Sequence, residues 1–281
     1  MPDPMIPPGA PAGTTARSGI GRRALFGAAV SIFAGLPIAT ALAQESEPPL
    51  DPRLAADTVT FQVRKSIFKG LLVRPRVGPK RAGILLIPDQ RGPSPYWRAL
   101  ARRFAMDGFI VLLPDLLAPF NLPEGSEEGM NLMGRIIPAE HQLALDAAAD
   151  LLVKHPECNG SIAVVGYTWG GPYAAQFAIA GTRVKAVVVH HATMPSPDKV
   201  ATAKVPMLFH WAENDPRTAP QIEAIEKRMI GAARVFETWI YPGLSGPFIV
   251  DTPSRGRDDR AADLAYERTV FFLRRHLGGG G

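Results

Sequence analysis

Five short, predominantly apolar runs most constrain how this chain can fold. They lie at 84–87, 109–113, 162–165, 184–189 and 205–209, and turns bound each of them. A strand covered on both faces reads this way, because neither of its sides meets water. Amphipathic segments near 96–107, 138–155, 171–181, 218–230 and 259–277 separate and follow the runs. The alternation predicts an α/β fold, a mostly parallel sheet with helices on both faces.

Two segments around this alternation read differently. Residues 58–64 (TVTFQVR) and 68–74 (FKGLLVR) alternate β-branched and polar residues about a short turn, which predicts an antiparallel hairpin at the start of the sheet. Residues 114–137 lack a clean period and follow the carboxyl end of a strand. A long irregular segment at that edge is typical of a lid or binding loop.

The first 43 residues predict a targeting segment. Arg22 and Arg23 precede a moderately apolar stretch over 24–42, and the segment ends in the small-x-small sequence Ala-Leu-Ala at 41–43. Paired arginines before a mild apolar stretch resemble a twin-arginine signal, which implies an exported, periplasmic protein. An uncleaved leader that anchors the chain in a membrane is the alternative. We therefore expect a signal peptide at 1–43, a flexible linker at 44–56 and one α/β domain at 57–281.

Composition argues against several classes of protein. The formal charge is +5, and removal of residues 1–43, which hold three arginines and one aspartate, leaves +3 with no run of five like charges. This gives no case for a nucleic-acid partner. Cys158 is the only cysteine, so no internal disulfide can form. No cofactor motif and no metal-ligand spacing such as H-x-H or H-E-x-x-H occurs, so we expect neither a cofactor nor a metal.

The segment at 161–178 is the most informative for function. An apolar strand runs into Gly-Tyr-Thr-Trp-Gly-Gly at 166–171, and a helix follows. This is the setting of a nucleophile elbow, G-x-nucleophile-x-G, in which glycines permit a turn too tight for flanking side chains. Thr168 occupies the central position, at the amino end of a helix whose dipole favours an anion. A β-branched secondary alcohol is a poor attacking group without a close base, so Thr168 either preserves the turn or acts as a nucleophile.

The ordered motifs of the mature chain resemble the dienelactone hydrolase family. They are ILLIPDQRG at 84–92, ALARRFAMDGFIVLLPDL at 99–116, the elbow, PMLFHWAENDP at 206–216, YPGLSGPF at 241–248 and DDRAADLAYERTVFFLRRHLG at 258–278. The resemblance spans about 200 residues. It implies an α/β-hydrolase fold for the domain at 57–281 and, in active members, hydrolysis of lactones or esters by a Cys-His-Asp triad.

The resemblance implies a triad that this chain has largely lost. The family's nucleophilic cysteine falls on Thr168, and its triad aspartate falls on Asp215 and is kept. Its triad histidine falls on Gly246, because the flanking Tyr-Pro-Gly at 241–243 and Phe248 fix the register. Two of the three triad positions are therefore replaced.

Other family positions are also changed. The family's glutamate after the first core strand falls on Asp89, and its two substrate-binding arginines fall on Pro119 and near Val250. The oxyanion hole is made by backbone amides, which here would be those of Trp169 and Gln90. Almost any residue can supply such a donor, so this part of the site survives substitution.

A rewired base could replace the missing histidine. His191 and His210 lie at the ends of apolar strands, where either could approach Thr168, and Asp89 is a third candidate. His191 ranks first, while a packed or capping role remains the simpler interpretation of each histidine. His190 and His191 should point to opposite faces of their strand. His141, His155 and His276 are expected on the surface.

Two functions remain open from the sequence. In the first, the hydrolase pocket is kept for binding a small molecule, with weak or no classical ester or lactone hydrolysis. In the second, the chain is an active carboxylic ester or lactone hydrolase with a rewired base. Loss of the triad histidine favours the first, because the triad acts as a unit. The intact elbow and Asp215 favour the second.

Overall fold

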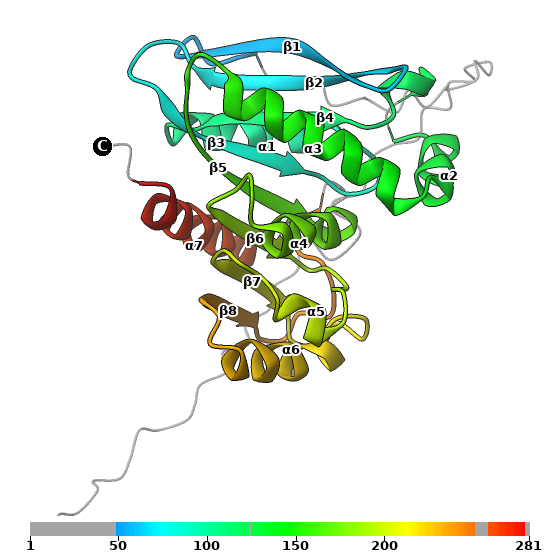
Figure 1. The fold of residues 1–281 in the computed structure, drawn as a ribbon, viewed down its shortest axis with the longest axis vertical. Coiled ribbons are helices and arrows are strands. Elements are labelled where there is room, and N and C mark those ends of the chain that lie inside the picture. The colour runs from blue at the N-terminus through cyan, green and yellow to red at the C-terminus, as the bar shows by residue number, and fades with distance from the viewer. Residues whose placement is uncertain (1–48, 124, 251–257, 279–281) are drawn as a thin grey trace, which may run out of the picture. The chain divides into compact units, whose positions relative to one another are not determined.

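A computed structural model describes residues 49–123, 125–250 and 258–278. An eight-stranded sheet in the order β1-β2-β4-β3-β5-β6-β7-β8 forms its centre (Figure 1). The strands are β1 (Leu54–Val63), β2 (Ser66–Pro75), β3 (Arg81–Ile87), β4 (Ile110–Asp115), β5 (Cys158–Tyr167), β6 (Ala186–His190), β7 (Met207–Ala212) and β8 (Phe236–Tyr241). The helices are α1 (Pro95–Met106), α2 (Glu127–Arg135), α3 (Pro138–Lys154), α4 (Gly171–Ala180), α5 (Pro197–Val200), α6 (Ala219–Gly231) and α7 (Asp259–Leu277).

The predicted fold class is confirmed. β1 and β2 form an antiparallel hairpin, and β2 also pairs antiparallel with β4. Every later pairing, from β3 with β4 to β7 with β8, is parallel. The carboxyl ends of the parallel strands therefore meet at one edge of the sheet, where ligands bind in open α/β folds.

The continuous apolar runs have the cause expected from their pattern. Along β3, Leu85 and Ile87 pack into the core on the side of α3, α4 and α6, whereas Ile84 and Leu86 pack on the side of α1 and α7. All four side chains are fully buried. A strand with helices over both faces needs apolar side chains at every position.

The segment at 114–137 is more regular than its sequence suggested. It contains a short 3₁₀ turn (Ala118–Phe120) and helix α2, whose amino end is capped by the Ser126 hydroxyl accepting from the Gly129 amide at 3.1 Å. Glu127 and Glu128 stand in the first turn of α2, where the helix dipole favours negative charge. A helix of nine residues is too short for its period to stand out among the surrounding turns.

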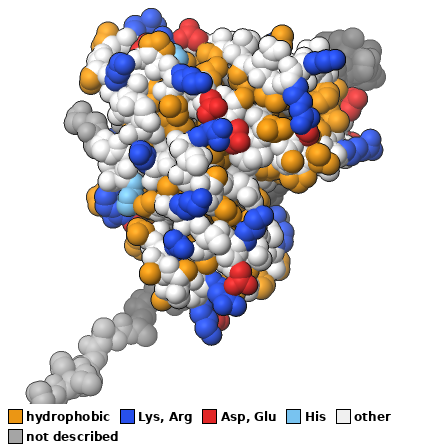
Figure 2. Space-filling model, in the orientation of Figure 1, with side chains coloured by type: hydrophobic (Ala, Val, Ile, Leu, Met, Phe, Trp, Pro, Cys, Tyr) orange, Lys and Arg blue, Asp and Glu red, His pale blue; other side chains and the backbone are white. Residues whose placement is uncertain are grey.

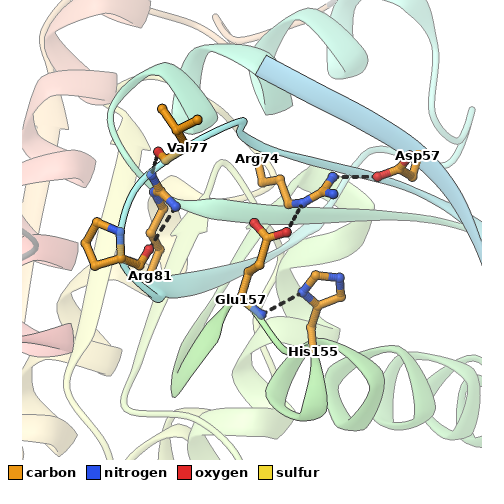
Figure 3. Close-up of polar contacts among 7 residues, drawn as sticks. Asp57, Arg74, Val77, Arg81, His155 and Glu157 are labelled. Carbon is orange, nitrogen blue, oxygen red and sulfur yellow. Dashed lines mark hydrogen bonds and ion pairs between the residues drawn. The ribbon is translucent and has the colours of Figure 1, made fainter. Parts of the chain in front are cut away.

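Ion pairs tie the hairpin to the start of β5, far along the chain (Figure 3). Arg74 of β2 donates to Asp57 of β1 at 2.5 Å and to Glu157 at 2.8 Å. The Glu157 amide in turn donates to His155 Nδ1 at 3.2 Å. These groups are partly exposed, so the network contributes little to stability, on the order of 1 kcal/mol per pair or less.

The surface facing the viewer in Figure 2 mixes side chains of all kinds. Lysine and arginine side chains are spread over it among apolar and uncharged groups. Within the described part of the chain, no helix is long and apolar enough to cross a membrane. The predicted signal peptide, residues 1–43, lies outside the described residues, as do residues 44–48 of the predicted linker. The last three linker residues, 54–56, belong to β1, so the folded domain begins earlier than the sequence predicted.

Candidate functional site

The elbow forms where its sequence predicted a sharp turn. β5 ends at Tyr167, Thr168 takes a left-handed backbone conformation with φ of 44°, and α4 begins at Gly171. Such a φ is strained for a β-branched residue, so the surrounding structure must hold it in place. Thr168 is thereby raised above the sheet edge, close to the amino end of α4.

Three glycines of the elbow are required by contacts. A Cβ on Gly166 would lie 2.5 Å from the Gly170 carbonyl oxygen, and one on Gly170 would lie 2.6 Å from the Ile87 carbonyl oxygen. A Cβ on Gly171 would lie 2.2 Å from that of Ala192. The strand, turn and helix therefore pack more closely than any side chain at these positions permits.

A cavity of about 1110 Å³ opens above the elbow. It brings together most of the site positions expected from the sequence: Thr168, Trp169, Asp89, Gln90, His191, Asp215, Gly246 and Val250. His210 and Pro119 are not among the residues that line it. The cavity is also bordered by Arg91, Tyr173, Lys199 and Arg217.

Asp215, the position predicted to correspond to the family's triad acid, is bound by an arginine. Its carboxylate is only 1% exposed and lies in the turn that follows β7. Arg217 donates to it through Nη2 at 3.0 Å, through Nε at 3.3 Å and through its own backbone amide at 3.0 Å. The guanidinium compensates the buried negative charge, a task that an imidazole performs in a triad.

Gly246, the position predicted to correspond to the family's histidine, has open space where a side chain would begin. It lies in the loop between β8 and α7 and lines the cavity. A Cβ built on it meets nothing within 4 Å, and its φ is not in the left-handed region. A Cβ at position 246 is therefore sterically acceptable, and the backbone there does not require glycine.

His191 is the one imidazole among the cavity-lining residues. It follows β6 in a left-handed conformation with φ of 50°, and its ring packs against Phe248 with centroids 4.1 Å apart. Both ring nitrogens are buried and have no hydrogen-bond partner among the described residues, so the imidazole makes no hydrogen bond to the Thr168 hydroxyl. Burial lowers the pKa of His191 to about 3; the nearby Asp215 charge opposes this shift and that of Arg217 adds to it.

His210, the second candidate base, lies in the core. Its Nδ1 is 2.9 Å from the Tyr241 hydroxyl and its Nε2 is 3.1 Å from the Thr269 hydroxyl. Both nitrogens are therefore occupied, and the ring stacks on His190 rather than entering the cavity. The prediction that His190 and His191 point to opposite faces is wrong: their ring centroids lie 6.0 Å apart, because β6 ends at His190 and the left-handed backbone of His191 breaks the alternation of the strand.

Comparison with known proteins places this geometry in a family. The dienelactone hydrolase family model matches residues 68–277. The chain belongs to the dienelactone hydrolase family. It is 27% identical over 241 residues to a probable 2-oxo-3-(5-oxofuran-2-ylidene)propanoate lactonase of a Bradyrhizobium species, covering 80% of this chain and 96% of that protein. It is 22% identical over 206 residues to a carboxymethylenebutenolidase of Rhodococcus opacus, covering 69% and 81% of the two chains.

Solved structures share the fold. A putative dienelactone hydrolase from Klebsiella pneumoniae superposes with a TM-score of 0.69 at 17% identity, over 78% of this chain and 98% of the other. A dienelactone hydrolase-like promiscuous phosphotriesterase from metagenomic libraries gives 0.71 at 18% identity, over 80% and 100%. At these identities the likeness concerns the fold alone.

One histidine of this dienelactone hydrolase family member was misplaced by the sequence analysis. His141 was expected on the surface, but it is 3% exposed on α3, with Nδ1 2.9 Å from the Tyr173 hydroxyl. Burial lowers its pKa to about 4. It lies on the same stripe of α3 as the buried Leu145, Ala148 and Leu152, a spacing of four, seven and eleven residues that could have revealed it. His155 and His276 are partly exposed.

Several cavity residues were missed by the sequence analysis. Arg217 stands two residues after Asp215, and this proximity was the available signal. Lys199 and Tyr173 carried no signal of their own. Among the aromatic residues near the elbow, Trp169 lines the cavity, whereas Tyr167 and Trp97 are buried in the core. Asp89 accepts from the Arg91 amide at 3.0 Å, which fixes the turn after β3.

No metal centre is formed by the described residues. Groups of three or more histidine, cysteine or carboxylate side chains placed to hold an ion are absent from this part of the chain. Cys158, the single cysteine, is buried at the start of β5, and burial raises the pKa of its thiol. A thiol in that state is unreactive.

Proposed function

We propose that this protein is an exported dienelactone hydrolase family member with a degenerate triad. Its cavity binds a small molecule, and classical hydrolysis of esters or lactones is weak or lost. The observation that carries the proposal is the state of the triad acid: Asp215 is bound by Arg217, and position 246, from which the family's histidine would reach it, holds glycine.

The chemistry of Thr168 supports the same conclusion. A threonine hydroxyl needs a base within about 3.2 Å to attack a carbonyl carbon at neutral pH. His191 is the available imidazole, but it makes no hydrogen bond to that hydroxyl, and a pKa of about 3 makes it a weak proton acceptor. Removal of triad members in a serine hydrolase costs on the order of 10⁴- to 10⁶-fold in turnover.

The walls of the cavity support ligand binding. Trp169 and Tyr173 offer aromatic surface beside Thr168, and their rings lie 4.6 Å apart. Polar and charged groups from other loops, such as Gln90 and Lys199, complete the lining. A few polar groups in a largely preformed cavity are typical of a small-molecule site.

The test is turnover by the purified protein beside its Thr168→Ala variant. Activated short-chain esters and simple lactones form the panel, with the compounds in the names of the Bradyrhizobium and Rhodococcus relatives included. We expect the two proteins to give equal rates, since Thr168 is not activated. A wild-type rate at least ten times that of Thr168→Ala would overturn the proposal.

The second candidate is an active ester or lactone hydrolase with a rewired base. The observation in its favour is that His191 and Asp215 line the cavity with Thr168, and that the Asp215 charge favours protonation of His191. Under this alternative, His191→Phe abolishes the activity that Thr168→Ala abolishes. An activity that survives His191→Phe excludes His191 as the base.

Export is proposed from the leader alone. Replacement of the Arg22-Arg23 pair by two lysines should retain the protein in the cytoplasm of a producing bacterium, because the twin-arginine route reads the pair. Cleavage after Ala43 should leave a mature chain that begins at Gln44. A mature protein that keeps its leader and sediments with membranes would instead support the anchored alternative.

A further inference from the structure

A row of four rings, three of them stacked, crosses four neighbouring strands of the sheet at their carboxyl ends. Tyr167 of β5 stacks on His190 of β6 at 4.3 Å with 9° between the planes, and His190 stacks on His210 of β7 at 4.3 Å and 10°. Tyr241 of β8 closes the series, 5.8 Å from His210. These residues, Tyr167, His190, His210 and Tyr241, are called the ring ladder below.

The ring ladder adjoins both strained residues of the cavity. Thr168 follows Tyr167 and His191 follows His190, and each has a positive φ although neither is glycine. Strained conformations of this kind persist only where neighbouring contacts determine them. The amide of His191 also donates to the carbonyl of His210 at 3.0 Å, so the next strand holds this residue directly.

Thr269 of α7 bridges the imidazoles of His190 and His210. Its hydroxyl is fully buried and lies 3.3 Å from His190 Nε2 and 3.1 Å from His210 Nε2. A hydroxyl has one hydrogen, so it donates to one ring and accepts from the other. The link is therefore directional.

The direction of the two Thr269 hydrogen bonds follows from the His190 nitrogen that has no partner. His190 Nδ1 is buried without a hydrogen-bond partner among the described residues, and an unpaired buried N–H is rarer than an unpaired acceptor. The proton of His190 therefore sits on Nε2 and is donated to Thr269. The Thr269 hydroxyl donates to His210 Nε2, and His210 donates from Nδ1 to the Tyr241 oxygen 2.9 Å away.

We propose that Thr269 is a positioning residue of the cavity: by linking the neutral imidazoles of His190 and His210, it holds Thr168 and His191 in their left-handed conformations. The inference rests on the proposed function only in treating these two residues as parts of the ligand site. It requires His210 to be neutral, because its Nε2 accepts from Thr269, and His190 to be neutral, because a second proton on that ring would lie on the buried Nδ1, which has no partner among the described residues.

The surroundings favour neutral rings. The titratable groups that face them are Tyr167 from β5, His191 at the end of β6, Tyr241 from β8 and Arg268 from α7. None of these groups is a carboxylate that could stabilise an imidazolium. Burial, and then the neighbouring charges, lowers the pKa of both His190 and His210 well below the usual value.

The first test reads the proton positions in the wild-type protein. Long-range ¹H–¹⁵N NMR spectra of the histidine rings at pH 7 should show His190 protonated at Nε2 and His210 at Nδ1. A proton on His190 Nδ1, or an imidazolium at either residue, would overturn the proposal. This measurement needs no variant and no ligand.

The second test follows the geometry of the elbow. Thr168→Cys places a thiol at the amino end of α4, where the helix should hold its pKa below the ordinary value of about 8.5. The pH dependence of alkylation by iodoacetamide gives that pKa, and the buried Cys158 supplies the background, measured in Thr168→Ala. Adding Thr269→Val should raise the thiol pKa by about one unit and slow alkylation at pH 7 about 10-fold, whereas adding Thr269→Ser should not.

Measuring the stability of the Thr269 variants distinguishes a positioning role of Thr269 from a role in packing alone. Thr269→Val leaves two buried imidazole nitrogens unpaired, so its unfolding constant should rise about 10- to 100-fold, and Thr269→Ser should recover most of this. A folded Thr269→Val variant with an unchanged thiol pKa would contradict the proposal. Ester turnover is not measured in either test, so failure here is distinct from failure of the proposed function.

Discussion

The two sides of the cavity differ in how closely they match the pattern expected from the family. The side at the ends of β3 and β5 consists of tight turns, and it keeps the glycines, the strained Thr168 and the turn of Asp89. The side at the ends of β7 and β8 depends on side chains, and there glycine stands at 246 while Arg217 binds Asp215. Under the proposed function, the backbone geometry is kept because the fold itself requires it, whereas a catalytic side chain contributes little to folding and can be replaced.

The largest effect on activity should come from introducing triad side chains, including one on the side of the cavity at the ends of β7 and β8. Thr168→Cys with Gly246→His supplies both missing triad groups, and position 246 has room for a side chain. We expect hydrolysis of an activated ester about 10²- to 10⁴-fold above Thr168→Ala with Gly246→His, the matched control that lacks only the nucleophile. Initial rates with p-nitrophenyl acetate measure it.

Arg217 sharpens this experiment. Because it already occupies the Asp215 carboxylate, the introduced histidine must compete for its acid partner. Adding Arg217→Leu to the double variant should therefore raise the rate further. A folded triple variant that remains inert would show that position 246 does not correspond to the triad histidine.

On the side of the cavity formed by tight turns, at the ends of β3 and β5, an added methyl group should lower the stability of the fold most. Gly170→Ala would place Cβ against the carbonyl oxygens of Ile87 and Pro88, so we expect a loss of about 3 kcal/mol in the free energy of unfolding. Gly246→Ala is the matched control in open space, and its effect should stay within about 0.5 kcal/mol. Urea unfolding followed by circular dichroism gives both values. Equal effects of the two changes would mean that the elbow is not tightly packed.

Much of the fold was predictable, because the spacing of apolar residues and glycines along the sequence indicates its strands and turns. The continuous apolar runs specified buried parallel strands, and the glycines of 166–171 specified the turn. The partners of side chains were not predictable in this way. His210 is buried because the hydroxyls of Tyr241 and Thr269 pair both of its ring nitrogens, and no local pattern encodes contacts with residues 31 and 59 positions away.

Arg217 illustrates the same limit within the site. The sequence placed Asp215 after its strand, but only the folded turn showed that an arginine two residues later reaches back to the carboxylate. Thr168, Asp215 and Gly246 were predicted as neighbours, and they line one cavity. Their catalytic roles stay predictions.

A smaller effect concerns pH and the buried histidines. His141 and His191 have pKa values lowered to about 4 and about 3 by burial, while in the unfolded chain both lie near 6.5. Above pH 6.5 the rings are neutral in both states; below it the unfolded chain binds more protons, so stability falls as the pH drops from 6.5 toward 4. Each ring should cost about 1.4 kcal/mol per pH unit in this window.

Replacing His141 should show how much this one imidazole contributes to the pH dependence of stability. His141→Phe should reduce the loss of stability between pH 6 and 5 by about 1 kcal/mol, measured by urea unfolding at the two pH values. His155→Phe, at a partly exposed position, is the control and should change the loss by less. An unchanged pH dependence in His141→Phe would mean that His141 titrates normally in the folded protein.

The most direct measurement asks whether the Thr168 hydroxyl is activated. A fluorophosphonate reacts covalently with a hydroxyl that has a base beside it and spares one that does not. After prolonged incubation at neutral pH, the intact mass of the wild-type protein should be unchanged, and the peptide that contains Thr168 should be unmodified. A stoichiometric adduct on Thr168 that disappears in His191→Phe would show a working relay in this cavity and contradict a silenced triad.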